Sequence, residues 1–582
     1  MLIANVVAMR TREVGDYVYR VSQPSIALGR EAGVEVVTVG MLSPHLADVV
    51  LAADVAILHL LCEDDLFPLL AARQRLGRPT VYEISDNILE PADGTGISGW
   101  FADPDRRGNA LALMGAADAV QVTGRGLAER FASFVNGAHI FPNQVASLGP
   151  APRPVGEQVT IGWGGSASHL DDLELLAPAL TEVCRRHANA VFAFMGDQRL
   201  FARFFSHLPA TQRRYHAPGS LEDYYHFLST LDIGVAPLAP TAYNLCRSDV
   251  KFVEYASRGV APVLSAVGPY LDYAAPGETA LLWGSPQELV GHLSDLVAQG
   301  EKRSALAHRA YDYVKQQRLE SDSAGQRLGF YRRLLTRSVS KTRELPPGSV
   351  RLDPGSAAWE VESSPAEDLL VAGIRAESEG RLDEARQAYK AAQARDPSYR
   401  LPWFWLGRSL ERGGDDEGAL ACLRKAAAGE PPSLRALLHL ARLEAKRDPR
   451  RALALIERSA LSAPLHAPLL ELAADLRERL GDLEAARDYY QAAFETNPAS
   501  STAAASLGRF CARTGQPLLA LAALERAVEL SPSDAALHCD CAEQYLAHGE
   551  ADRAYRHGLR ALELAPRAPR PRALAERLLA AA

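Results

Sequence analysis

The sequence predicts an α/β half followed by an all-α half. Over residues 1–335, short apolar runs alternate with segments of helical spacing. In the last third, prolines recur at intervals of 34, 33, 34, 34 and 34 residues, at Pro397, Pro431, Pro464, Pro498, Pro532 and Pro566. Glycines run in phase with them, at Gly380, Gly414, Gly481, Gly515 and Gly549. A fixed period near 34 indicates stacked helix pairs, so we expect any catalytic chemistry in the first half.

Length, charge and composition limit the classes of protein to which this chain can belong. With 582 residues, the chain is long enough for three to five domains of roughly 100–200 residues. The net charge of −8 argues against a nucleic-acid platform, and no stretch reaches the ~18 apolar residues of a membrane span. The N-terminus resembles a first strand more than a signal peptide. Seven scattered cysteines suggest free thiols, which predicts a reducing cytoplasm.

Residues 1–145 are predicted to form the first α/β domain. Helical spacing is seen at 24–32 and 66–76, between runs that are short and β-like. The predicted strands are residues 3–8, 34–39, 55–60, 80–84, 119–122 and 139–141. Such alternation predicts a parallel sheet covered by helices, with ligands at the carboxyl ends of its strands.

A segment rich in Pro and Gly, residues 146–158, predicts a hinge. A second α/β domain is expected over 159–337, with helices in its last fifty residues. Its predicted strands are residues 159–163, 191–195, 233–237, 262–265 and 280–283. Residues 338–364, rich in Ser, Lys, Pro, Gly and Asp, are interpreted as a linker to the repeats.

Residues 365–582 are predicted to be a solenoid of six helix pairs. In each unit a glycine allows the tight turn, an alanine five residues later permits close helix crossing, and a proline ends the second helix. This pattern resembles the tetratricopeptide repeat. One unit departs from it, since Asp448-Pro449 stands where the glycine is expected, and its turn should be irregular. Residues 567–582 are expected to cap the array.

Repeat arrays of this kind usually bind a peptide or protein, or mediate self-association. The alternative is that the array only makes the protein rigid.

Four motifs in the second domain point to a known family. Ile161-Gly-Trp-Gly-Gly-Ser166 precedes His169, and Phe194-Met-Gly-Asp ends the second predicted strand. Residues 231–238 read Leu-Asp-Ile-Gly-Val-Ala-Pro-Leu. Residues 251–263 resemble the signature K-x-x-E-x-x-x-x-G-x-P-V. Together these resemble GT-B glycosyltransferases of the large retaining group called group 1 or family 4.

The resemblance implies two Rossmann-like domains, an acceptor domain followed by a donor domain for a UDP- or GDP-linked sugar. It also implies a retaining, metal-independent reaction with no cofactor besides the nucleotide-sugar donor. No DxD motif for a divalent metal stands where another class of transferase would need one, because Asp171-Asp172 is interpreted as a helix cap.

On the donor side the resemblance assigns the diphosphate to Lys251, supported by Arg247. Glu254 lies one helical turn later, and a carboxylate suits a ribose diol. The alternative is a solvent-exposed Lys–Glu pair, with Arg247 also at the surface. Further donor-binding candidates are Gly164, Gly165, Ser166, His169 and Asn244. The glycines would let the backbone approach phosphate, although an ordinary strand-helix turn could also explain them.

One position departs from the family. The glutamate that often stands eight residues before the second one is Cys246 here. Either Tyr243, Asn244 and nearby backbone amides hold the sugar instead, or turnover is impaired.

The acceptor-side candidates are Arg12, Gly15 and Asp16 in the loop after the first strand, with His59 and Asp86 at strand ends. A lone histidine at a strand end is often structural.

Two functions follow. The first is a glycosyltransferase whose repeats recruit the acceptor (glycan, lipid or protein) or a partner. The second is a catalytically impaired scaffold or nucleotide-sugar sensor, in which the repeats do the work.

Overall fold

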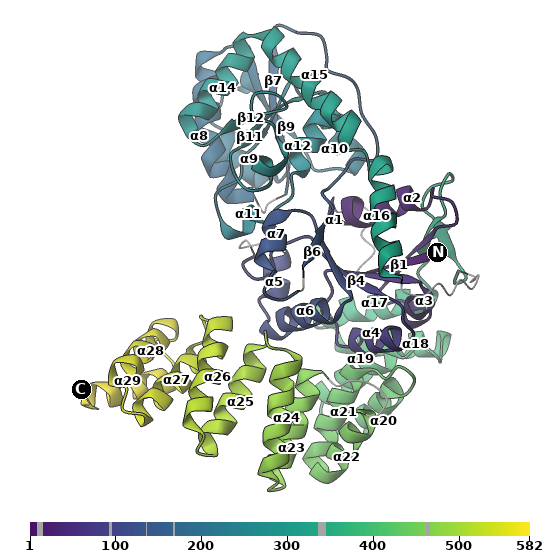
Figure 1. The fold of residues 1–582 in the computed structure, drawn as a ribbon, viewed down its shortest axis with the longest axis vertical. Coiled ribbons are helices and arrows are strands. Elements are labelled where there is room, and N and C mark those ends of the chain that lie inside the picture. Colours follow the sequence, from purple (N-terminus) through teal and green to yellow (C-terminus); the bar gives the residue numbers. More distant parts are fainter. Residues whose placement is uncertain are drawn as a thin grey trace.

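The computed structural model describes residues 1–8, 15–91, 96–135, 137–166, 169–335, 345–460 and 466–581. Figure 1 shows two α/β domains and a curved array of helices that runs beneath the first domain. None of the helices in these ranges combines the length and the apolar character that crossing a membrane requires.

The first sheet contains all six strands expected from residues 1–145. They are β1 (Leu2–Val7), β2 (Glu35–Gly40), β3 (Val55–His59), β4 (Thr80–Ile84), β5 (Ala119–Val122) and β6 (Ala138–Ile140). These six pair in parallel in the order β2-β1-β3-β4-β5-β6. The helices of this domain are α1 (Gly15–Tyr17), the π-helical turn η1 (Val18–Ser22), α2 (Gln23–Leu28), α3 (Leu46–Ala52), α4 (Leu66–Arg75), α5 (Gly96–Phe101), α6 (Pro104–Ala116) and α7 (Arg125–Arg130).

The second sheet is also parallel, in the order β12-β11-β10-β7-β8-β9. Its strands are β7 (Val159–Gly164), β8 (Ala190–Met195), β9 (Arg213–His216), β10 (Ile233–Ala236), β11 (Ala261–Ser265) and β12 (Leu281–Trp283). Its helices are α8 (Leu170–Arg186), α9 (Gln198–Phe205), α10 (Leu221–Ser229), α11 (Ala242–Leu245), α12 (Val250–Ser257), α13 (Pro269–Tyr273), α14 (Pro286–Ala298) and α15 (Gly300–Gln317). The sequence did not predict β9, because this half-exposed edge strand reads Arg-Arg-Tyr-His and lacks an apolar run.

Two later segments return to the first domain. Helix α16 (Glu320–Leu334) packs against α2. Strands β13 (Ser349–Arg351) and β14 (Ala358–Val361) extend the first sheet, and β14 pairs in parallel with β2. The prediction that 338–364 is a linker is therefore wrong for these strands. Their composition is loop-like, and only pairing with a strand more than 300 residues away buries Ala358 and Val361.

The described helices after residue 364 form six antiparallel pairs and a last helix. They are α17 (Pro365–Ser378), α18 (Leu382–Arg395), α19 (Leu401–Arg412), α20 (Asp416–Ala427), α21 (Leu434–Arg447), α22 (Pro449–Ala460), α23 (Ala467–Arg479), α24 (Leu483–Thr496), α25 (Ser501–Arg513), α26 (Pro517–Leu530), α27 (Ala535–Ala547), α28 (Ala551–Leu564) and α29 (Pro569–Ala581). The five glycines of the comb have φ between 73° and 85°, which only glycine adopts at low cost. The turn without glycine is irregular as predicted, since Asp448 is extended at φ −146° and Pro449 starts the next helix directly.

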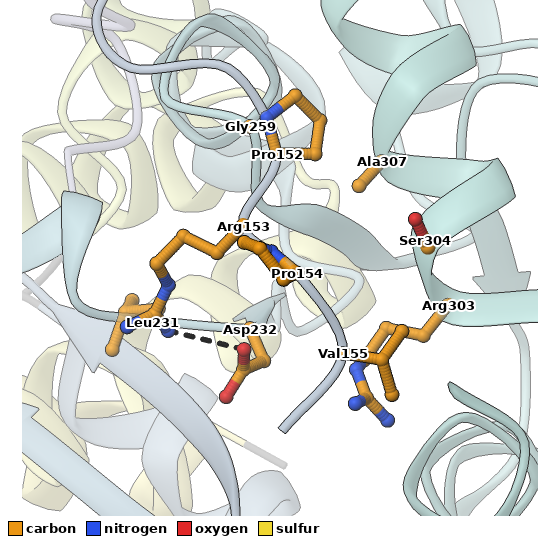
Figure 2. A pocket seen from close by; sticks show the side chains of 10 residues that line it. All are labelled: Pro152, Arg153, Pro154, Val155, Leu231, Asp232, Gly259, Arg303, Ser304 and Ala307. Atoms are coloured by element: carbon orange, nitrogen blue, oxygen red, sulfur yellow. Dashed lines mark hydrogen bonds and ion pairs between the residues drawn. The ribbon is translucent and has the colours of Figure 1, made fainter. Parts of the chain in front are cut away.

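The predicted hinge lies against the second domain. Figure 2 shows Pro152, Pro154 and Val155 beside Arg303, Ser304 and Ala307 of α15. The space that these residues line has a volume of about 20 Å³. Arg153 pairs with Asp232 at 3.1 Å. Gly259 has φ 70°, and a Cβ there would lie 2.5 Å from the backbone nitrogen of Pro152. Gly259, the glycine of the signature motif, therefore allows the hinge backbone to pack closely against the second domain.

Replacing Gly259 by alanine should destabilise the fold by roughly 1–2 kcal/mol or more, because it adds left-handed strain to a clash with backbone. Urea unfolding measures the change. Gly291→Ala is the matched control, since this glycine lies inside α14 with open space around it, and the substitution should stabilise the helix slightly. Equal stability of the two variants would contradict the packing role of Gly259.

Candidate functional site

A cleft of about 540 Å³ lies between the two α/β domains. The loops that line it follow the carboxyl ends of strands in both sheets, where open α/β sheets bind ligands. Lining residues from the first domain include Gly15, Asp16, Tyr19, Ser85, Asp86, Thr123 and Asn143. Those from the second include Gly165, Ser166, His169, Met195, Tyr224, Arg247, Lys251 and Glu254. Polar side chains from distant parts of the chain thus meet in one place.

Glu254 lines this cleft and accepts hydrogen bonds from three donors. The Tyr19 hydroxyl donates to Oε1 at 2.7 Å, and the Tyr224 hydroxyl donates to Oε2 at 2.8 Å. Lys251 Nζ lies 3.3 Å from Oε2. Tyr19 belongs to the first domain, so the carboxylate is shared between the two domains. Sequence reasoning missed both tyrosines, since neither belongs to a recognised motif.

Lys251 and Glu254 face the same side of α12, as their spacing predicts. Lys251 Nζ also donates to the Tyr224 hydroxyl at 2.6 Å and lies 4.7 Å from the centre of that ring. The side chains of Lys251 and Glu254 are only 16% and 5% exposed. This degree of burial excludes the alternative of a solvent-exposed pair.

A chain of hydrogen bonds between polar side chains holds Arg247 in the cleft. Its Nη1 lies 2.7 Å from His169 Nε2, and His169 Nδ1 lies 2.6 Å from Asp172. A guanidinium can only donate, so Nε2 accepts and Nδ1 carries the proton that is donated to Asp172. Burial, together with the Arg247 charge, lowers the pKa of His169 to about 4. His169 is therefore neutral, and its ring positions Arg247.

Two of the donor-side candidates do not line the cleft. Asn244 is buried and donates to Asp172 at 2.9 Å and to the Ala239 carbonyl at 3.0 Å. Gly164 lies under α10, where a Cβ would come within 2.8 Å of the Tyr224 ring. Both residues shape the loops around the cleft, while Gly165 and Ser166 line it.

Cys246, at the position of the missing glutamate, points away from the cleft. Its side chain is buried in the apolar core of the first domain, and burial raises the pKa of the thiol to about 11. The backbone of the same loop contacts α7, because a Cβ on Gly126 would lie 2.2 Å from the Leu245 carbonyl. The side chain at this position therefore packs on the first domain and does not line the described cleft.

On the acceptor side, Asp16 and Asp86 line the cleft beside Ser85, whose hydroxyl donates to Asp16 at 3.0 Å. The Tyr243 hydroxyl donates to Asp86 at 3.0 Å across the domain boundary. Burial and the neighbouring Asp16 charge raise the pKa of Asp86 to about 6. A carboxyl group in this range can exchange a proton near neutral pH.

The remaining acceptor-side candidates are not in the described cleft. His59 is buried beneath the sheet edge, where its Nε2 lies 2.8 Å from Asn5 Oδ1. Burial lowers its pKa to about 3, and His59 is not among the residues that line the described cleft, which favours the structural alternative. Arg12 lies outside the described residues.

The two domains are joined by a buried cation. Arg318 contacts both carboxylate oxygens of Asp249, at 2.6 and 3.0 Å, with the pair almost wholly buried. The same guanidinium donates to the Asn143 carbonyl and to the Gln144 side chain. Asp249 stands next to α12, so this pair ties the helix that carries Lys251 to the start of the hinge.

In the described parts of the chain, no group of three or more His, Cys, Asp or Glu side chains is arranged to hold a metal ion. Metal independence remains a prediction from the resemblance.

The raised pKa of Asp86 predicts a pH dependence of stability. The pKa of Asp86 in the folded protein lies above the ordinary value of 3.8. Protonated Asp86 therefore favours the folded state, and the free energy of unfolding decreases as the pH rises from about 4 to 6 and the group ionises. Relative to the parent protein, Asp86→Asn should therefore gain roughly 1–3 kcal/mol between pH 4 and pH 7. Urea unfolding at both pH values tests this, with the exposed Asp312→Asn as control. A constant difference across pH would contradict the assignment.

A known family matches the repeat half of the chain. Residues 370–434, 437–504 and 471–535 match the tetratricopeptide repeat family. Among solved structures, Anabaena HepE in complex with UDP-glucose is 15% identical, with 57% of this chain and 100% of that chain covered and a TM-score of 0.42. TarM is 11% identical, covering 49% and 58% with a TM-score of 0.39.

The Cut9–Hcn1 assembly of the APC/C is 21% identical over 37% of this chain, with a TM-score of 0.32, and the match spans 42% of that chain. No curated protein matches the sequence. The strand order and parallel pairing of the two sheets carry the fold assignment. The chain thus consists of two α/β domains, each built around a sheet of parallel strands, followed by tetratricopeptide repeats.

Proposed function

We propose that the two α/β domains form a glycosyltransferase that moves a sugar from a UDP- or GDP-linked donor to an acceptor. The observation that carries this proposal is the position of Lys251 and Arg247. Both cations reach the interdomain cleft at the carboxyl side of the second sheet, beside the buried carboxylate of Glu254.

The chemistry requires stabilisation of a departing diphosphate. Negative charge grows on the phosphate oxygens as the sugar leaves, and fixed cations in a partly dry cleft stabilise that charge. Lys251 and Arg247 are such cations, since their neighbours already hold them in place. Gly165 and Ser166 offer backbone groups at the end of β7. In this proposal the reaction is retaining and needs no metal ion.

Glu254 is proposed to bind the ribose. Its two oxygens already accept from the Tyr19 and Tyr224 hydroxyls, which are the same kind of donor as the two ribose hydroxyls. A ribose diol can therefore take the place of tyrosine hydroxyls without leaving the carboxylate unsatisfied.

The acceptor is proposed to enter from the side of the first domain. Asp16 and Asp86 face the cleft there, opposite the cationic wall of the second domain. Asp86 has a pKa of about 6, so it can accept a hydrogen bond or a proton from an acceptor hydroxyl at neutral pH. A cytoplasmic location belongs to this proposal, in keeping with seven cysteines that are all free.

The second candidate is a scaffold or sensor that binds a nucleotide-sugar without turnover. It is favoured by one observation, the burial of Cys246 in the first domain at the position where relatives often carry a sugar-binding glutamate. Binding of nucleotide alone does not separate the two functions, whereas transfer or hydrolysis of the sugar does.

The test is release of nucleoside diphosphate from a panel of UDP- and GDP-linked sugars. One donor should give release, and Lys251→Ala should lower the rate by about 10²–10³-fold with little change in melting temperature. Lys302→Ala is the matched control, because this lysine is half-exposed on α15 and pairs only with Asp295 in the described structure.

Full activity of Lys251→Ala would contradict the assignment of Lys251 to the diphosphate site. No release from any donor, with cell extract supplied as a source of acceptor and nucleotide binding intact, would favour the scaffold.

A further inference from the structure

The carboxylate that is proposed to bind the ribose is covered by a side chain of the other domain. Glu254 and Tyr19 are each only 4% exposed, although both line the cleft. The Tyr19 hydroxyl donates to Glu254 Oε1 at 2.7 Å. A carboxylate surface that admits almost no water admits no ribose diol. Oε1 is therefore closed to a ligand while Tyr19 stays in place.

A second hydrogen bond holds Tyr19 in this position. The Tyr225 hydroxyl lies 2.8 Å from the Tyr19 hydroxyl. A tyrosine hydroxyl carries a single hydrogen, and Tyr19 uses its own on the carboxylate, so Tyr225 donates to Tyr19. Burial and the neighbouring Glu254 charge raise the pKa of Tyr19 well above its usual range, which keeps Tyr19 protonated as a donor. Tyr19 is therefore a firmly held occupant of the carboxylate.

The backbone around Tyr19 is anchored in the first domain. Tyr19 lies in the π-helical turn η1, a rare conformation that is frequent at functional sites. Two residues before it, the Tyr17 hydroxyl donates to Glu360 at 3.2 Å. The next residue, Arg20, pairs with Glu83 at 2.7 Å in the interior of the domain. These contacts fix the turn to the first sheet, while the Tyr19 side chain reaches across to the second domain.

The second tyrosine on the carboxylate is placed differently. Tyr224 donates to Oε2 at 2.8 Å and comes from α10, in the same domain as Glu254. Its hydroxyl also accepts from Lys251 Nζ at 2.6 Å, so its departure would take a partner from the proposed diphosphate cation. Tyr19 bonds to Glu254 and Tyr225, and neither is proposed to hold the diphosphate. Tyr19 is therefore the hydroxyl that a ribose can replace.

We infer that Tyr19 is an internal competitor of the donor: it occupies the ribose position on Glu254 and has to leave before a nucleotide-sugar binds there. The inference deepens the proposed function, because it rests on Glu254 as the ribose site, but it concerns binding and not transfer. The affinity for the donor is then set in part by the free energy of releasing Tyr19. One contact thus joins the two domains and opposes binding of the donor.

The test compares the full chain with its Tyr19→Phe variant by calorimetric titration with UDP and with GDP. The variant lacks the hydroxyl that competes for Oε1 but keeps the ring that packs in the core. Binding of the nucleotide then adds a hydrogen bond to the carboxylate, whereas in the parent chain it exchanges one for another. We expect the variant to bind the nucleotide about tenfold more tightly. Melting temperatures confirm the folding of both proteins.

The 2′,3′-dideoxy form of the same nucleotide isolates the contribution of the ribose. It has no diol to compete for Glu254, so Tyr19→Phe should change its affinity by less than about twofold. An equal gain in affinity for the nucleotide and for its dideoxy form would place the effect of Tyr19 outside the ribose site, and the inference would then be wrong.

Two further variants remove a tyrosine hydroxyl as matched controls. Tyr224→Phe removes a donor from the same carboxylate but also a partner from Lys251, so it should bind nucleotide more weakly than the parent chain. Tyr555→Phe, at a position on α28 that is 39% exposed, should bind like the parent chain. Tighter binding by Tyr224→Phe would assign the competition to Tyr224 instead. Unchanged or weaker binding by Tyr19→Phe would mean that Tyr19 supports Glu254 and does not compete for it.

The outcomes separate this inference from the proposed function. Tighter binding of nucleotide by Tyr19→Phe, in a chain that releases no nucleoside diphosphate from any donor, supports the inference and contradicts the transferase. Release from one donor, with the same nucleotide affinity in parent and variant, does the reverse. If neither UDP nor GDP binds to the parent chain or to the variant, the assignment of Glu254 to the ribose is wrong, and the inference fails with it.

Discussion

The buried guanidinium of Arg318 is the contact on which the arrangement of the two α/β domains depends. It lies between α15 and α16, where the chain leaves the second domain for the first, and it pairs with Asp249 just before α12. It also donates to the Asn143 carbonyl. A buried ion pair of this kind resists loss of either partner, since the remaining charge would be uncompensated. The relative position of α12 and the hinge follows from this pair.

The cleft follows from that position. Once α12 is held against the hinge, Glu254 comes within reach of Tyr19, and Tyr243 comes within reach of Asp86. Each hydrogen bond joins one domain to the other through a tyrosine hydroxyl. Because hydroxyls can be exchanged for those of a ligand at small net cost, these bridges hold the cleft together in a form that a hydroxylated ligand can enter. The Arg318–Asp249 ion pair is a permanent contact between the domains, whereas the tyrosine hydrogen bonds can be exchanged for hydrogen bonds to a ligand.

The repeat array also makes direct contacts with the first domain. It supplies partners for the carboxylates before α4, and it lies close to α6, where a Cβ on Gly108 would come within 2.9 Å of the Asn497 side chain. The starts of α21 and α23 and the end of α24 are therefore already engaged within the chain. Any protein that binds there meets a composite surface, because array and sheet edge face the same groove.

Local pattern alone determined much of this protein. The paired helices of the repeats, the turn glycines and the strands of both sheets with apolar runs were predictable, since each of these signals lies in residues close in sequence. The Lys251–Glu254 spacing likewise placed both side chains on one face of a helix. Tertiary structure decided the rest. Strand β14 gains its burial from β2, Glu254 gains Tyr19 from another domain, and His59, Asn244 and Cys246 turn away from the cleft. These outcomes depend on contacts between residues far apart in the chain, and no local periodicity records which distant side chain will be the partner.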